Sequence, residues 1–264
     1  MSRHILLIVE GAVTEPKVFG KIFKKYGFEV IKKGKLNKTL ENSEYLINSN
    51  EYKKENNTIT IVQGTHSMLN HVIKSYDANT DNFESFFTEC SDCYNGIFFV
   101  YDVDHTTNEN LERLSIILNN ETEGMLLLSS PCLEILSEPK RINPIEVNKL
   151  REYKKERNIE CHEVYKKDTL SYIIENFESL ILYFLEQNFK DFNEPNIMNH
   201  PSLIINKINQ NNIREESYVN YRYFTTVIYV CIAHALGLTK QIENYNDVYH
   251  FFKSKINTKE ECLV

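Results

Sequence analysis

Two short apolar runs, each ending in acidic residues, constrain the fold of this chain more than any other feature. Residues 5–9 lead into Glu10 and Gly11, and residues 96–101 lead into Asp102-Val103-Asp104. Apolar runs of this length, rich in β-branched and aromatic residues, predict buried strands of a parallel sheet. Ligands of open α/β sheets collect outside the carboxyl ends of the strands. We therefore expect the acidic side chains to meet in one crevice.

A divalent cation is the simplest way to keep such carboxylates together. Acidic groups that share a cleft repel one another unless a cation neutralises them. Mg²⁺ prefers hard oxygen ligands, namely carboxylates, waters and phosphate oxygens. The sequence therefore predicts a site for Mg²⁺ or Mn²⁺ built from Glu10, Asp102 and Asp104. Asp102 and Asp104 stand two apart, so their side chains point to the same side. Glu10 is expected as a further ligand or as a general base.

Strand and helix patterns alternate through the first half of the chain. Further strands are expected at residues 58–62 and 125–128, and helices at residues 14–26, 66–76 and 108–119. Residues 32–57 are polar and are expected to form a surface excursion with room for a short helix. The alternation predicts an α/β fold, with a mostly parallel sheet flanked by helices.

The pattern changes after about residue 138, where it becomes almost entirely helical. We expect an α/β catalytic domain over residues 1–138 and a helical C-terminal region, packed on it, over residues 139–264. The expected helices of this region are residues 145–157, 170–188, 204–211, 221–236 and 248–256.

Composition and charge narrow the class of protein. The chain has 264 residues and a formal net charge of −7, which argues against a generally basic nucleic-acid coat. No apolar stretch approaches the length of a membrane span, and Met1 leads directly towards a strand, so we expect a cytoplasmic protein that does not enter membranes. The six cysteines do not resemble a secreted disulfide framework. Cys90 and Cys93 have CxxC spacing, but no second pair completes a zinc site.

Lysines crowd into the segment that follows Glu10. We expect Lys21, Lys24 and Lys25, on a lysine-rich stretch from Lys17 to Lys38, to attract the phosphate backbone of a nucleic acid. A solvated helix face is the alternative. Lys166 and Lys167, further along, are expected to stabilise phosphorane charge, with a solvated lysine pair as the alternative.

The acidic motifs occur in an order that resembles a TOPRIM domain. The carriers are Glu10-Gly11-x-x-Thr14-Glu15, Asp102-x-Asp104 and the segment Ser-Ser-Pro-Cys-Leu-Glu-Ile-Leu at residues 129–136. Proteins of the RloB-like branch have a similar first motif, in which a proline follows as Pro16 does here. They also have a segment similar to residues 129–134 after the Asp-x-Asp motif. Tyr165-Lys166-Lys167 is also similar to that branch, whereas position 130 is serine where the branch has asparagine.

This resemblance implies a function. TOPRIM nucleases of this kind are metal-dependent endonucleases, so the resemblance implies hydrolysis of DNA or RNA, tRNA included, in bacterial anti-phage defence. It also implies a partner ATPase or regulatory subunit.

Glu134 lies in the segment after the strand at 125–128, so we expect it at the same sheet edge as Asp102, with a catalytic role. A glutamate favoured by a helix dipole is the alternative.

Two other functions fit parts of the sequence. Asp102-Val103-Asp104-His105-Thr106 also has the spacing of haloacid-dehalogenase-like phosphatases, in which Asp102 would be the nucleophile. The α/β unit is alternatively a metal-free scaffold that binds a partner protein or a nucleotide.

Overall fold

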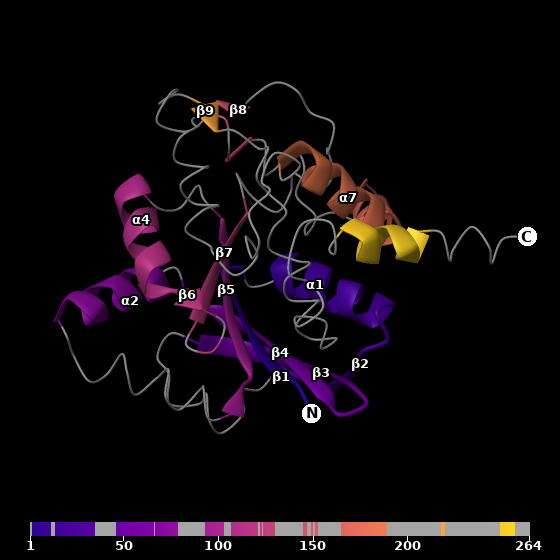
Figure 1. Ribbon diagram of the computed structural model, residues 1–264, viewed down its shortest axis with the longest axis horizontal. Helices are drawn as coiled ribbons and strands as arrows, with labels where there is room; N and C mark the ends of the chain where they lie inside the picture. Colours follow the sequence, from indigo (N-terminus) through magenta and orange to yellow (C-terminus); the bar gives the residue numbers. More distant parts are fainter. Residues whose placement is uncertain are drawn as a thin grey trace, which may run out of the picture.

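The structure is a computed structural model, shown in Figure 1. It describes residues 2–11, 14–34, 46–65, 67–78, 93–102, 107–120, 122, 124–129, 145–146, 149, 151–152, 165–188, 218–219 and 249–256.

A seven-stranded sheet forms the centre of the molecule, in the order β2-β3-β4-β1-β5-β7-β6 (Figure 1). Its four middle strands run parallel to one another. They are β4 (Asn57–Gly64), β1 (His4–Val9), β5 (Gly96–Asp102) and β7 (Gly124–Ser129). Every residue of β5 is buried, as is β1 after His4, because helices cover both faces of the sheet. The predicted strands are confirmed.

The outer strands were not predicted from the sequence. β2 (Glu29–Lys33) and β3 (Leu46–Lys54) form an antiparallel ladder that pairs with β4, and the two-residue β6 (Asn119–Asn120) pairs with β7. The expectation of a surface excursion over residues 32–57 is therefore wrong where the structure describes it. Most of β3 is polar, and only three of its residues, Leu46 and Tyr52 among them, are buried. An outer strand with so few buried residues lacks a continuous apolar run.

Three predicted helices cover the sheet, and they divide between its faces. α2 (Ser67–Ala78) and α4 (Asn108–Ile117) lie on one side in Figure 1, and α1 (Thr14–Lys25) lies on the other. The core beneath α2 and α4 is formed by apolar residues from the sheet and from both helices, including Leu6, Ile8, Val62, Met68, Val72, Phe99, Tyr101, Leu111 and Leu114. These helices connect the parallel strands, which confirms the α/β class.

The end of α1 has a well-defined stop signal. Gly27 has a φ of +86°, a conformation that glycine adopts without strain. The Gly27 N–H donates to the Lys24 carbonyl, and the Phe28 N–H donates to the Phe23 carbonyl, both at 3.0 Å. This is the Schellman pattern, and the rings of Phe23 and Phe28 pack edge to face across it. The cap fixes where the last turn of α1 places Lys25 and Tyr26.

Two helices of the C-terminal half pack against the end of α1, where Lys25 pairs with Glu178 and Tyr26 packs edge to face on Phe177. α6 (Tyr165–Glu175) and α7 (Phe177–Asn188) replace the single helix expected over residues 170–188. Between them, both the main chain and the side-chain amide of Asn176 donate to the Tyr172 carbonyl at 3.0 Å. Side-chain competition for a helix carbonyl favours such an interruption. Residues 249–256 are helical, as expected for residues 248–256, and Phe252 packs edge to face on Phe177.

Another helix prediction is wrong at its start. Ile145–Glu146 forms β8, which pairs antiparallel with β9 (Tyr218–Val219), whereas a helix was expected from residue 145. In the sequence, Ile145 and Val147 alternate with a glutamate, so a two-residue period fits them as well as a helical one.

The helices expected at 204–211 and 221–236 lie outside the described residues, and the domain boundary at residue 138 stays a prediction. None of the described helices has the length and apolarity needed to cross a membrane.

Candidate metal centre at the carboxyl edge of the sheet

Glu10 and Asp102 lie at the point of the sheet where ligands usually bind. Numbered along the chain, the parallel strands have the order 2-1-3-4, so the connections on either side of the β1–β5 pair run in opposite directions. The chain leaves β1 towards α1 on one face and leaves β5 towards α4 on the other (Figure 1). Such a switch point opens a crevice beyond the carboxyl ends of the two strands. Glu10 follows β1, and Asp102 is the last residue of β5.

The two acidic residues are in direct contact. The Glu10 N–H donates to the Val100 carbonyl at 3.2 Å, which continues the parallel ladder past the end of β1. The Asp102 N–H then donates to Oε2 of Glu10 at 3.1 Å, so a side-chain carboxylate supplies the next acceptor. Glu10 is only 6% exposed and Asp102 only 7%. Two carboxylates are thus held on neighbouring strands with little access to water.

This donor set fits a hard divalent cation. Mg²⁺ and Mn²⁺ sites commonly use one or two carboxylates, with waters and substrate oxygens completing the coordination. Among the described residues, no group of three or more histidine, cysteine, aspartate or glutamate side chains is positioned to hold a metal ion. Asp104 and Glu134 lie outside those residues, so their places in the site stay predictions.

Glu15 is a further acidic residue at this end of the sheet, and in the sequence it was named only as part of the motif that resembles a TOPRIM domain. It lies in the first turn of α1 and is 9% exposed. Its carboxylate folds against Gly11, where a Cβ added to the glycine would come within 1.7 Å of Oε2. Gly11 therefore leaves the space that the Glu15 carboxylate occupies. The available signal in the sequence was a glutamate five residues after Glu10. Whether such a glutamate lies near the site depends on the path of the turn that joins β1 to α1.

Tyr101 was also missed, because in the sequence it is part of an apolar strand. Its side chain is 2% exposed and belongs to the core beneath α2 and α4. A Cβ on Gly64, at the end of β4, would lie 2.6 Å from the Tyr101 hydroxyl. The ring therefore reaches from β5 across β1 to β4. Burial, with a smaller contribution from the negative charge of Glu10, raises the pKa of Tyr101 well above its ordinary value.

The lysines of α1 do not behave as a group. Lys17, Lys21 and Lys24 are exposed at helical spacing along one face. α1 starts near the carboxyl edge and rises about 1.5 Å per residue, which places Lys24 roughly 15 Å from the start of the helix. Lys17 is thus nearest to the candidate site, and Lys24 is at the far end.

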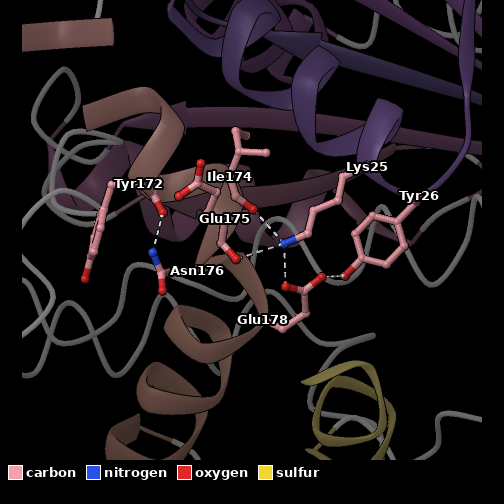
Figure 2. A network of polar contacts seen from close by, with 7 residues as sticks. All are labelled: Lys25, Tyr26, Tyr172, Ile174, Glu175, Asn176 and Glu178. Carbon is pink, nitrogen blue, oxygen red and sulfur yellow. Dashed lines mark hydrogen bonds and ion pairs between the residues drawn. The ribbon is translucent and has the colours of Figure 1, made fainter. Parts of the chain in front are cut away.

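The contacts of Lys25 do not fit the phosphate-binding role that was predicted for it from the sequence. Figure 2 shows its ammonium paired with Glu178 at the start of α7 and directed at the end of α6. It donates to the carbonyls of Ile174 at 2.6 Å and Glu175 at 3.5 Å. With 15% of its side chain exposed, Lys25 serves the internal packing of α1 against α6 and α7. Lys166 and Lys167 lie in α6, and their side chains are outside the described part of the structure.

Comparisons with known proteins do not add an identification. No family model, no curated protein and no solved structure matches this chain. A proposal for its function therefore depends on the fold, on the Glu10–Asp102 contact and on the motifs of the sequence.

Proposed function

We propose that this chain is a divalent-metal-dependent nuclease that hydrolyses phosphodiester bonds of DNA or RNA. The observation that carries the proposal is the contact between Glu10 and Asp102 at the switch point of the sheet. Both side chains are buried, both are acidic, and both come from strand ends where α/β proteins bind their ligands. Phosphodiester hydrolysis is a common use of such metal sites.

The roles of the side chains follow from their chemistry. Glu10 and Asp102, with Asp104, would hold Mg²⁺ or Mn²⁺. When bound, the cation supplies Lewis-acid stabilisation of phosphate charge and lowers the pKa of a coordinated water. Glu10 is proposed as a ligand or as the base that accepts the proton of the attacking water. Glu134 is proposed as a further acidic residue of this edge, and Lys166 and Lys167 as groups that stabilise charge on the phosphate.

The biological setting is proposed from the sequence resemblance. A TOPRIM domain of the RloB-like kind would act in the cytoplasm in bacterial anti-phage defence, with tRNA among its candidate substrates. A partner ATPase or regulatory subunit would then control the nuclease. The parallel strands and flanking helices are compatible with this resemblance.

A cleavage assay tests the proposal directly. Purified full-length chain is incubated with plasmid DNA, single-stranded DNA and bulk tRNA, in Mg²⁺, in Mn²⁺ and in EDTA. We expect cleavage of at least one substrate with a metal and none in EDTA. Absence of cleavage under every condition, together with no calorimetric binding of divalent metal at millimolar concentration, would contradict the proposal. A phosphorylated Asp102 trapped with a phosphate-monoester substrate would support the phosphatase alternative instead.

The exposed lysines of α1 give a separate prediction. Charge reversal at Lys17, Lys21 and Lys24 should weaken nucleic-acid binding and flatten its salt dependence, by roughly one unit of slope for each phosphate that is no longer neutralised. Fluorescence anisotropy with a labelled substrate at several salt concentrations measures this slope. Lys74→Glu is the matched control, because Lys74 is an exposed lysine on α2, across the sheet. An unchanged slope in the triple variant would make these lysines an ordinary solvated helix face.

A further inference from the structure

Glu10 and Tyr101 are neighbours in one row across the sheet. The last paired residues are Gln63, Val9 and Val100, on β4, β1 and β5. One residue further, this row contains Gly64, Glu10 and Tyr101, and the Glu10 N–H still donates to the Val100 carbonyl. Neighbouring strands are about 4.8 Å apart, so Glu10 and Tyr101 start from adjacent positions.

Side-chain alternation puts both residues on the same face. Leu6 and Ile8 of β1 belong to the core under α2 and α4, together with Phe99 and Tyr101 of β5. Glu10 continues the Leu6–Ile8 alternation, so its side chain starts on the face occupied by Tyr101. The Tyr101 ring crosses β1 to reach Gly64, and its hydroxyl is close enough to Glu10 for that negative charge to raise the pKa of Tyr101.

Within the described part of the chain, the Tyr101 hydroxyl is a buried donor with no acceptor. Among the residues that the structure describes, its oxygen makes no hydrogen bond, and it is shielded from solvent. An unsatisfied buried hydroxyl costs free energy, and each such group in a folded protein calls for a physical explanation. The adjacent carboxylate is the charged acceptor of this row, and a hydroxyl–carboxylate hydrogen bond is among the stronger ones in proteins.

We propose that Tyr101 is a positioning residue for Glu10. With a divalent cation bound at the β1–β5 edge, the Tyr101 hydroxyl donates a hydrogen bond to the Glu10 carboxylate and holds it in the orientation that binds the ion. This inference rests on the proposed metal-dependent function. Carboxylate ligands of metals are commonly oriented by such outer hydrogen bonds, and their loss typically weakens metal binding by about 10- to 100-fold.

Tyr101→Phe tests the inference, because it removes the hydroxyl and keeps the ring. Mn²⁺ affinity is measured by calorimetry on the full chain, and thermal unfolding is measured in EDTA. We expect about tenfold weaker Mn²⁺ binding, with a melting temperature in EDTA equal to or above that of the wild type. Tyr52→Phe is the control. Tyr52 is a 5% exposed tyrosine of β3, its ring packs near Phe23 of α1, and its substitution should leave Mn²⁺ affinity unchanged.

The outcomes separate this inference from the proposed function. Wild-type and Tyr101→Phe affinities within about twofold of each other would refute the positioning role and leave the metal site standing. A clearly lower melting temperature of Tyr101→Phe in EDTA would also overturn it, since the hydroxyl would then have a partner in the metal-free protein. A wild-type chain that binds no Mn²⁺ would refute the proposed function, and the inference with it.

Discussion

Glu10→Gln is expected to abolish metal-dependent cleavage while the protein stays folded. The glutamine side chain still offers an oxygen to the Asp102 N–H, which now donates to Oε2 of Glu10 at 3.1 Å. It carries no charge for a cation and accepts no proton from an attacking water. Loss of a general base alone costs roughly 10²- to 10⁴-fold in rate, and loss of a metal ligand adds to this. Initial cleavage rates in Mg²⁺ and Mn²⁺ measure the effect.

Two further variants sharpen this result. Asp102→Asn should be inactive for the same reason, because it removes the neighbouring buried charge. Glu29→Gln is the control: Glu29 is an exposed glutamate on β2, at the far edge of the sheet, and its loss should leave the rate unchanged. The Glu10→Gln variant could also cleave at nearly the wild-type rate, with the circular dichroism and melting temperature of the wild type. That result would show that Glu10 has no role in the reaction.

Lys25→Ala is expected to cause the largest loss of stability among the α1 lysines. Its ammonium joins three groups on α6 and α7, and the Tyr26 hydroxyl donates to the same Glu178 at 3.3 Å (Figure 2). Glu178 is 4% exposed, so the variant leaves a nearly buried charge without its cation. Removing one partner of a buried pair typically costs about 3–5 kcal/mol, and we expect about 3 kcal/mol because Lys25 is partly exposed.

Urea unfolding measures this difference, with Lys24→Ala as the control. Lys24 precedes Lys25 on the same helix and is exposed, so its loss should change the free energy of unfolding by no more than about 0.5 kcal/mol. The double variant Lys25→Met/Glu178→Leu should recover much of the stability, because replacing both charges by apolar side chains removes the desolvation cost. Equal stabilities of Lys25→Ala and Lys24→Ala would show that the pair contributes nothing.

The parallel core and the meeting of Glu10 with Asp102 were predictable from the sequence. Continuous apolar runs define buried parallel strands, and the ends of such strands share one edge. Residues 5–9 and 96–101 had both properties. β2 and β3 were not predictable in this way, because mostly polar outer strands lack the apolar run that marks a central strand.

The contacts of Tyr101, Gly64 and Lys25 could not be predicted from a sequence pattern. Tyr101 meets Gly64 and Glu10 only through the register of three strands. Lys25 resembles its exposed neighbours in sequence, and its partner Glu178 lies 153 residues away along the chain. Periodicity predicts which face of an element is buried, but it does not predict which distant element will cover one end of that face.

The central claim is that Glu10 and Asp102 hold a divalent cation together. Crystals of the full chain grown with Mn²⁺ test it most directly, through the anomalous scattering of the ion. We predict one strong peak at the β1–β5 edge, about 2.1 Å from an oxygen of each carboxylate, and its loss in crystals of Asp102→Asn. An edge without a peak at millimolar Mn²⁺, with Glu10 still accepting the Asp102 N–H, would contradict the claim.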